Sequence, residues 1–451
     1  KKPAKKKPAK KKPAKKKPAK KKPAKKKPAK KKPSRGTARS SVGSEPRGKV
    51  LFVPTQAARS RPRAYDPGPE LPAWECAGRS ATRTGSINLR LDPPLEELWR
   101  TSLGGAAGTS PIVSQDGKVY VADREGVLYA LDADSGVILA IHETDPIREA
   151  SPIWPLVQAG HVPGARVPVS SPPVVSGGSL LFGDDEGVFY CLRRGEWSVQ
   201  WRKAAPLELQ ARSGGAYQPA LASRGVVYVA CADGHAYAVE ARSGRSLFRI
   251  YLRGEPTAPP ALGGGKLLVA TRPVFKGESP RLHALGMQAG DRLWHVDLPG
   301  SARALLTTRE EAIVATEAGL SSIDLRRGGV RWEVSSEDLG GAPTCLSADR
   351  ERVYVGWDEG LAAVDLKDGG AILWTGRTNL ASVVTGLACG DEGVWLAAGR
   401  TLLAFDGLDG RTLGRASVGS ACVGGPVLGW ANLYVSTRGG DVVALAPEPG
   451  A

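Results

Sequence analysis

Cysteine and histidine are the residue types in this chain that most readily bind metals or act as nucleophiles. The sequence has no Cys-x-x-Cys pair, and its five His residues are dispersed without metal-ligand spacing. Chain pattern alone does not show whether any two cysteines approach within disulfide range. We expect free, buried thiols that act as small hydrophobic side chains, which favours a reducing compartment. The six cysteines are at positions 76, 191, 231, 345, 389 and 422.

Other arrangements that support catalysis are also missing from the sequence. It has no Gly-x-Ser-x-Gly nucleophile motif. The run Gly263–Gly265 lies between two predicted strands with no helix after it, which is typical of a turn rather than a phosphate-binding loop. Asp184, Asp185 and Asp233 fall at predicted turns, where Asp accepts local hydrogen bonds. The sequence therefore predicts no catalytic residue and no metal ligand, and we expect a protein that is not an enzyme.

The lysines of the N-terminal tail are candidate binding residues. Residues 1–33 repeat Lys-Lys-Lys-Pro-Ala and contain 20 Lys and no acid. Proline at every fifth position forbids a helix, and charge repulsion favours an extended chain. A lysine string would neutralise the phosphates of nucleic acid without reading bases, and anionic lipid headgroups would serve equally well. A solvated spacer is the alternative. The candidate polyanion-binding residues are Lys5, Lys6, Lys7, Lys15, Lys16, Lys17, Lys25, Lys26 and Lys27.

The formal net charge of +18 is a property of this tail and not of the rest of the chain. The tail contributes +20 and residues 34–72 contribute +4, which leaves −6 for residues 73–451. We predict three segments: the basic tail 1–33, a disordered linker 34–72 and one large domain 73–451. No apolar run reaches about 18 residues, so no transmembrane segment is predicted.

A repeat of roughly 40 residues organises the chain from about Ser110 to its end. Its signature places Ala or Ser, Asp, Gly and Trp at fixed spacing, as in Ser322, Asp324, Gly328 and Trp332. Ahead of each signature, runs alternate apolar and small side chains, which is typical of strands joined by glycine-containing hairpins. The signature occurs eight times. The sequence therefore predicts an all-β fold, an eight-bladed β-propeller with one blade per repeat.

The two ends of the repeat region complement each other. The last repeat ends before its aromatic position, and a predicted strand with Trp99 in that position precedes the first repeat. We predict that this N-terminal strand completes the last blade and closes the ring, which removes free sheet edges. The tryptophans are expected to pack between blades. In the first repeat Ala140 stands at the aromatic position.

The recurring signature resembles the tryptophan-docking repeat of pyrroloquinoline-quinone-type (quinoprotein-like) propellers. The segment from Trp74 to Gly85 is similar to the lead-in that precedes the first blade in that superfamily, and the resemblance covers residues 74–451. One branch of the superfamily holds quinone-dependent alcohol and glucose dehydrogenases. Another holds cofactor-free scaffolds, such as the lipoprotein propeller of the outer-membrane β-barrel assembly machine.

The dehydrogenase branch makes demands that this chain does not meet. The resemblance implies, for that branch, a Ca²⁺ site made of Glu, Asn and Asp, a catalytic Asp, an Arg beside the quinone and often a Cys-Cys disulfide. The chain has no Cys-Cys, and its Asn residues, Asn88, Asn379 and Asn432, lie beside no plausible Asp pair. The resemblance is therefore closer to the cofactor-free branch, and we expect no cofactor.

Two departures from the regular repeat are candidate partner-binding elements. The link between the first two blades, residues 142–169, is much longer than its counterparts and carries the candidate residues His142, Trp154 and His161. A smaller insertion spans residues 272–281. Long loops on a rigid scaffold often carry function. The alternative is that both insertions merely cover a blade junction.

The leading functional hypothesis is a non-catalytic, monomeric propeller that binds a protein or peptide partner. One alternative is the sensor or docking module of a larger protein, whose effector domain, for example a kinase, precedes Lys1. The other is a quinone- and calcium-dependent dehydrogenase. Free thiols favour the cytoplasm. The cell envelope or periplasm is the alternative compartment if a leader precedes Lys1.

Overall fold

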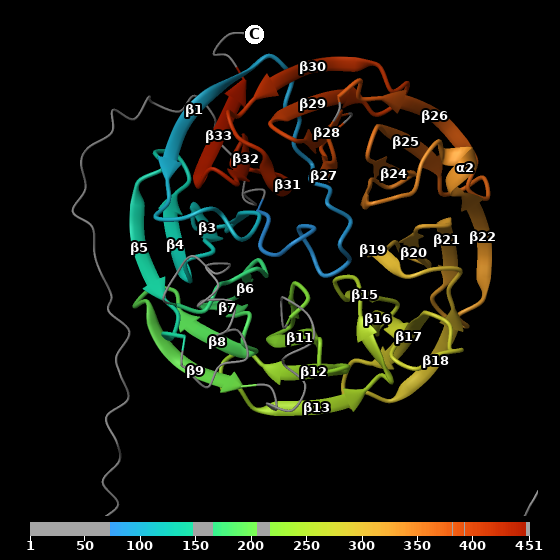
Figure 1. The fold of residues 1–451 in the computed structure, drawn as a ribbon, viewed down its shortest axis with the longest axis horizontal. Helices are drawn as coiled ribbons and strands as arrows, with labels where there is room; N and C mark the ends of the chain where they lie inside the picture. Colours follow the sequence, from blue (N-terminus) through green and yellow to red (C-terminus); the bar gives the residue numbers. More distant parts are fainter. Residues whose placement is uncertain (1–72, 148–165, 205–216, 381, 392, 448–451) are drawn as a thin grey trace, which may run out of the picture. The chain divides into compact units, whose positions relative to one another are not determined.

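A ring of antiparallel β-sheets makes up the part of the chain that the structure describes. The computed structural model describes residues 73–147, 166–204, 217–380, 382–391 and 393–447. All of these belong to one compact unit of the chain. They form eight sheets, arranged as blades around a central axis (Figure 1). The predicted all-β, eight-bladed propeller is therefore confirmed.

The blades are numbered in the chain order of their innermost strands. The first blade consists of β2 (Ile112–Val113), β3 (Lys118–Ala122), β4 (Val127–Asp132) and β5 (Ile138–Glu143). The second consists of β6 (Val174–Ser176), β7 (Ser179–Gly183), β8 (Val188–Arg193) and β9 (Ser198–Ala204). The third consists of β10 (Leu221–Ser223), β11 (Val226–Cys231), β12 (His235–Glu240) and β13 (Ser246–Tyr251). The fourth has five strands, β14 (Gly254–Pro256), β15 (Ala261–Gly263), β16 (Lys266–Pro273), β17 (Arg281–Gly286) and β18 (Arg292–Asp297).

The remaining blades repeat the same order from the centre outwards. The fifth consists of β19 (Ala302–Thr307), β20 (Glu311–Thr316), β21 (Gly319–Asp324) and β22 (Val330–Ser335), and the short helix α2 (Ser336–Leu339) follows it. The sixth consists of β23 (Cys345–Ala348), β24 (Arg352–Trp357), β25 (Gly360–Asp365) and β26 (Ile372–Arg377). The seventh consists of β27 (Val384–Cys389), β28 (Gly393–Ala398), β29 (Thr401–Asp406) and β30 (Thr412–Ser417). The eighth consists of β31 (Cys422–Gly429), β32 (Asn432–Thr437), β33 (Asp441–Pro447) and β1 (Leu95–Ser102).

The ring closes through a strand from the other end of the domain. Strand β1 pairs antiparallel with β33, and Trp99 stands opposite Ala444. Figure 1 shows the blue β1 beside the red β33. Strand β1 serves as the outermost strand of the last blade, which the last repeat itself lacks. The edge of β33 is therefore paired rather than open. The predicted closure by an N-terminal strand is confirmed.

Buried aspartates shape the hairpins between the second and third strands of several blades. Asp123 Oδ1 accepts hydrogen bonds from the N–H groups of Glu125 at 3.0 Å and Val127 at 2.8 Å, and its Oδ2 accepts one from the Tyr129 hydroxyl at 2.8 Å. In blade two, Asp184 accepts the corresponding hydrogen bonds, from the N–H groups of Glu186 and Val188 and from the Tyr190 hydroxyl. Burial raises the pKa of the Asp184 carboxyl to about 7. The role of these aspartates in local hydrogen bonding follows the sequence prediction.

Tryptophan side chains join neighbouring blades. The ring of Trp201 in blade two lies against Gly244 of blade three, and its Nε1 donates to the carbonyl oxygen of Ala241 at 2.9 Å. A Cβ atom at position 244 would lie 2.7 Å from the indole, so a larger residue would clash there. The same contact recurs between Trp99 and Gly136, Trp294 and Gly328, Trp332 and Gly370, and Trp374 and Gly410. The predicted packing of tryptophans between blades is confirmed at these junctions.

At the junction of blades one and two, the small residue is on the outer strand of blade one and the aromatic residue is in the turn of blade two, the reverse of the other junctions. Ala140 stands opposite Ala130 on the outer strand, where other blades carry an aromatic side chain. Trp197 takes the glycine position of the next turn, with φ +50° and its N–H bonded to the carbonyl oxygen of Arg193 at 2.8 Å. Ala140, Trp197 and Tyr120 belong to one hydrophobic cluster. The aromatic ring therefore comes from the opposite blade and still fills the junction.

The turn beneath Trp332 is one residue longer than its counterparts. The N–H of Gly370 bonds to the carbonyl oxygen of Asp365, five residues earlier rather than four. Among the described residues Trp332 Nε1 has no hydrogen-bond partner, whereas Trp294 Nε1 donates to the carbonyl oxygen of Leu325 at 3.3 Å. The longer turn is visible in the sequence. The Trp332 ring still contacts Gly370, but the indole hydrogen bond to the next blade is absent among the described residues.

The cysteines are free thiols, and all but one are buried. Cys345 is partly exposed, and the other five cysteines are buried. Cys389 Sγ, in blade seven, lies 3.0 Å from the hydroxyl of Ser347 in blade six. These positions agree with the predicted role as small hydrophobic side chains. Within the described ranges, no helix has the length and apolar character needed to cross a membrane.

Candidate functional site: the plugged central channel

Residues 73–91, which we call the plug segment, cross the centre of the ring (Figure 1). Trp74 exchanges backbone hydrogen bonds of 2.7 and 2.9 Å with Val113 of blade one. Backbone N–H groups of other blades donate to carbonyl oxygens of the plug: Val175 to Glu75, Leu262 to Ala81, Thr307 to Thr82, Ala348 to Thr84, and Cys389 to Gly85. Because these bonds reach blades one, two, four, five, six and seven, the plug acts as a structural part of the ring.

Arg83 anchors the middle of the plug segment. Its side chain is 5% exposed. Nε donates to the carbonyl oxygen of Pro260 at 2.9 Å, and the terminal nitrogens donate to the carbonyl oxygens of Ala77, Pro219 and Ala220. Burial lowers the pKa of the guanidinium, but four carbonyl dipoles compensate for the loss of water. Arg83 thereby ties the plug to blades three and four.

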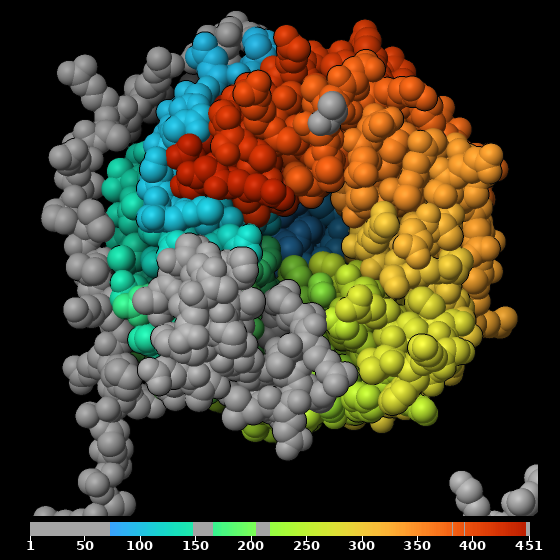
Figure 2. Space-filling model, viewed as in Figure 1, coloured from blue at the N-terminus to red at the C-terminus, as the bar shows by residue number. Residues whose placement is uncertain are grey.

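A cavity of about 370 Å³, which we call the funnel, lies above the plug at the axis of the ring. Figure 2 shows it as a central hollow with the blue plug at its floor. In each blade the funnel is lined by residues just before or at the start of the innermost strand, such as Arg303 to Leu305 ahead of Thr307, which bonds the plug. The funnel therefore opens on one face of the ring, and the plug lies on the side of its closed end.

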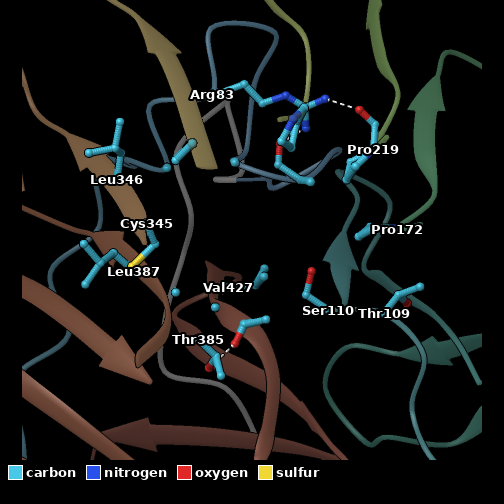
Figure 3. Close-up of a pocket in the computed structure, with 18 of the residues that line it drawn as sticks. Arg83, Thr109, Ser110, Pro172, Pro219, Cys345, Leu346, Thr385, Leu387 and Val427 are labelled. Atoms are coloured by element: carbon cyan, nitrogen blue, oxygen red, sulfur yellow. Dashed lines mark hydrogen bonds between the residues drawn. The ribbon is translucent and has the colours of Figure 1, made fainter. Parts of the chain in front are cut away.

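The funnel wall offers few groups that could do chemistry. Both threonine hydroxyls of blades six and seven are used within the protein. Thr344 Oγ1 donates to the carbonyl oxygen of Gly356 at 3.1 Å. Thr385 Oγ1 donates to that of Gly424 at 2.8 Å (Figure 3). Cys345 also lies on the wall, but burial raises the pKa of its thiol to about 12, so it is not a thiolate at neutral pH.

Arginine supplies the charge of the funnel. Among the described lining residues the charged side chains are Arg83, whose donors are occupied by carbonyls, and Arg303. The Arg303 side chain is 42% exposed, and its contact with Glu317 is 3.7 Å long. The remaining described wall is made of Gly, Pro, Ser, Thr and aliphatic residues, together with Trp74 and Cys345. An acidic or polar group that enters the funnel therefore meets a positive and largely apolar surface.

The funnel does not suit the calcium ion and quinone of the dehydrogenase branch. Ca²⁺ requires several oxygen ligands, mostly carboxylates. The described lining residues include no Asp or Glu, and the described part of the chain holds no group of three His, Cys, Asp or Glu that could bind a metal. The plug and the Arg83 side chain also fill the floor of the channel. The residues present therefore do not fit this cofactor pair.

The sequence-predicted partner-binding residues are not brought together at the funnel. His142 is 4% exposed on β5, with its ring 6.0 Å from Phe182 and 6.2 Å from Tyr190, so it packs inside the blade junction. Trp154, His161 and the candidate lysines of residues 1–33 lie outside the described residues. The insertion at 272–281 extends β16 and exposes Val274 and Phe275 by 56% and 55%.

Sequence reasoning missed the contributions of Arg83 and Arg303. Arg83 is part of the recognised lead-in, but nothing in the chain pattern shows that three of its carbonyl partners, Pro219, Ala220 and Pro260, lie more than a hundred residues away. Arg303 is the second residue of the innermost strand β19, at a position that the repeat register could have marked as facing the axis. The signal that could have found Arg303 is its place within the repeat, at the start of the strand nearest the axis.

The fold and the plugged channel define a repeat protein of the pyrroloquinoline-quinone-propeller type. The profile of the family described as outer membrane protein assembly factor BamB matches residues 83–162, 147–315 and 255–387. These matches together cover more than half of the chain. The protein therefore belongs to the BamB family, and the expected resemblance to the outer-membrane-assembly branch of the superfamily is confirmed.

Individual proteins of known identity are also similar to this chain. The outer membrane protein assembly factor BamB of Yersinia pestis is 25% identical over 262 residues, which cover 52% of this chain and 60% of that protein. The crystal structure of BamB from Moraxella catarrhalis has a TM-score of 0.59 at 15% identity and covers 78% of this chain and all of that one. Quinohemoprotein alcohol dehydrogenase from Comamonas testosteroni has a TM-score of 0.62 at 13% identity over 84% of this chain and 82% of that one. The two structural likenesses establish the fold alone.

Proposed function

We propose that this protein is a non-catalytic scaffold that binds a protein or peptide partner at the face where the funnel opens. The observation that carries the proposal is the plug segment, which bonds to inner strands around the ring and occupies the channel floor. A loop or an extended peptide fits the shallow space that remains, because its wall is apolar and its polar groups are mostly paired. Arg303 provides the point at which an acidic residue of the partner binds.

The family relationship supports a role in the assembly of outer membrane proteins. The matched relatives carry the name of an outer membrane protein assembly factor, and the alignment spans 60% of the Yersinia pestis protein. We propose on this basis that the chain acts in the cell envelope rather than in the cytoplasm, which the free thiols alone favoured. Cell fractionation tests the compartment: recovery with the cytoplasmic fraction contradicts it.

Site-specific photocrosslinking tests the docking face directly. A photoreactive amino acid at Ser170, an exposed residue of the funnel wall, is expected to capture a defined partner in cells. The matched control carries the same amino acid at Val330, which is 49% exposed on the outer strand β22. Arg303→Gln is expected to weaken capture from position 170. Capture of the same partner only from position 330 places the docking surface on the outer rim and contradicts the proposal.

We also propose that residues 1–33 form a separate polyanion-binding tail. The support is its composition, since 20 Lys and no acid in 33 residues give a dense array of phosphate contacts. DNA affinity is expected to fall steeply with salt, to show no sequence preference and to disappear when residues 1–33 are removed. DNA affinity that survives the deletion assigns the binding elsewhere and contradicts this role of the tail.

A further inference from the structure

A second cavity, which we call the basic pocket, lies where blades four and five meet and has a volume of about 500 Å³. Its walls are three turns: the one between β15 and β16, the one between β19 and β20, and the one between β21 and β22. The turn after β19 is at the opposite end of that strand from the funnel residues 303–305. The basic pocket therefore opens on the other face of the ring and is separate from the proposed docking site.

Positive side chains dominate this pocket, although residues 73–451 carry a net charge of −6. Five cationic side chains face three carboxylates, which leaves a local charge of +2. The cations are Lys266, Arg309, Arg326, Arg327 and Arg331, and the carboxylates are Glu310, Glu311 and Asp324. The basic pocket is thus a concentrated positive site on a body that is acidic overall.

One arginine pairs with all three carboxylates. Arg331 donates to Asp324 Oδ2 at 2.5 Å and to Glu311 Oε1 at 2.9 Å, and it lies 3.6 Å from Glu310 Oε2. Within the described part of the chain, Arg309, Arg326 and Arg327 form no salt bridge. The three residues are exposed, and their guanidinium groups retain donors for an external anion.

The backbone beneath these arginines is held in place. Asp324 Oδ1 accepts hydrogen bonds from the N–H groups of Arg326 at 2.8 Å and Arg327 at 2.9 Å, which fixes the turn after β21. The turn after β19 is closed by a hydrogen bond from the N–H of Thr308 to the carbonyl oxygen of Glu311 at 2.8 Å. Because two ordered turns hold these arginines beside one recess, binding a ligand there costs little conformational entropy of the backbone.

We propose that the basic pocket binds the phosphoryl groups of a phosphorylated ligand through Arg309, Arg326 and Arg327. A guanidinium donates two parallel hydrogen bonds to phosphoryl oxygens, and a diphosphate offers enough oxygens for several arginines at once. Its negative charge also offsets the repulsion among the clustered cations. The volume lies within the usual range of small-molecule pockets, about 300–1,000 Å³.

Inorganic pyrophosphate, titrated calorimetrically into the full chain, tests the proposal. Because the lysines of residues 1–33 also attract anions, hydrogen exchange of residues 308–311 and 324–329 locates the site. Binding is expected to slow exchange in both turns. Arg309→Gln combined with Arg326→Gln is expected to weaken this binding at least about tenfold, since each removes charge-assisted hydrogen bonds.

The matched control is Arg350→Gln. Arg350 occupies the corresponding turn of blade six, where Asp349 Oδ1 accepts hydrogen bonds from the N–H groups of Glu351 and Arg352, and it is outside the basic pocket. We expect this variant to bind pyrophosphate as the parent chain does. An equal loss in the control variant, or unchanged binding in the double variant, overturns the proposal.

Vesicles distinguish a soluble ligand from a lipid headgroup. Phosphatidylcholine vesicles that contain phosphatidylinositol bisphosphate are sedimented with the parent chain and with the double variant. Pyrophosphate binding with no difference in sedimentation between the two proteins identifies a soluble phosphorylated ligand. Sedimentation that the double variant loses identifies a lipid headgroup. If neither pyrophosphate nor the vesicles protect the two turns from exchange, the proposal is wrong.

Discussion

The indole Nε1 of Trp99 lies 3.0 Å from the carbonyl oxygen of Ala133, and this hydrogen bond joins the last blade of the ring to the first. Trp99 is on β1, which pairs with β33 at the other end of the domain, while Ala133 follows β4 of blade one. The ring of Trp99 also packs on Gly136, where a Cβ atom would lie 2.5 Å from it. One side chain thus secures the closure of the propeller.

Replacing Trp99 tests this closure. Trp99→Ala is expected to lower the free energy of unfolding by about 3–5 kcal/mol, because a buried aromatic ring is lost where two blades meet. Urea denaturation measures the change. The neighbouring Leu98→Ala is the control: its side chain is 40% exposed, and we expect a loss below about 1 kcal/mol. Equal losses in the two variants contradict the closure role of Trp99.

The exchanged residues at the junction of blades one and two allow a compensation experiment. Ala140→Trp alone is expected to destabilise the protein by about 1–3 kcal/mol, because Trp197 already fills that junction. Adding Trp197→Gly restores the pattern of the other blades, so the double variant is expected to be more stable than either single variant. A double-mutant cycle in urea measures this coupling. Additive losses show that Ala140 and Trp197 do not share the space.

The repeat pattern made the ring and its closure predictable, because one signature recurs in register and each copy reports on the same local structure. The sequence showed that Ala140 replaces an aromatic residue. It did not show that Trp197 occupies the glycine position of the next turn, because that depends on the positive φ of Trp197. The plug segment occurs once, and its partners are inner strands from residue 113 to residue 389. Such long-range pairing leaves no local pattern in the sequence.

The basic pocket was hidden for a related reason. Lys266, Arg309 and Arg326 belong to turns of two different repeats, and each of them is ordinary in a solvent-exposed turn. Only the contact between blades four and five brings them to one recess. The net charge of −6 for residues 73–451 pointed away from an anion site, because a sum over the domain does not show where charges gather.

The buried His142 predicts a pH dependence of stability. Burial lowers the pKa of its imidazole from 6.5 to about 4, so the folded state favours the neutral ring. Between these values the unfolded chain binds the proton more readily. The contribution of His142 to the free energy of unfolding therefore falls as the pH drops from about 6.5 to 4, by up to about 3 kcal/mol.

His142→Phe isolates this effect, since the ring still packs against Phe182 and Tyr190. The variant is expected to lose less stability than the parent between pH 7 and pH 4.5. Urea denaturation at both pH values measures the difference. Burial lowers the pKa of His283 in the same way, and His283 remains in both proteins, so it cancels in the comparison. Identical pH dependence in the two proteins rules out a neutral, buried His142.

Arg83 is expected to control the order of the plug segment. Arg83→Met removes the hydrogen bonds to four carbonyl oxygens and is expected to lower the free energy of unfolding by about 2–5 kcal/mol. Hydrogen exchange of residues 73–91 should become faster. Arg79→Met is the control within the same segment, because Arg79 Nε has no hydrogen-bond partner among the described residues. Unchanged exchange in Arg83→Met contradicts the anchoring role.

The central claim is that the plug segment fills the channel and leaves a docking propeller rather than a quinone enzyme. The most direct test is to titrate the full chain with pyrroloquinoline quinone and Ca²⁺ in a calorimeter while following hydrogen exchange of residues 73–91 and dye reduction with alcohols. We predict no heat of binding, unchanged exchange and no dye reduction. Stoichiometric binding with faster exchange in the plug segment, or dye reduction, would show that the channel accepts the cofactor and would contradict the account.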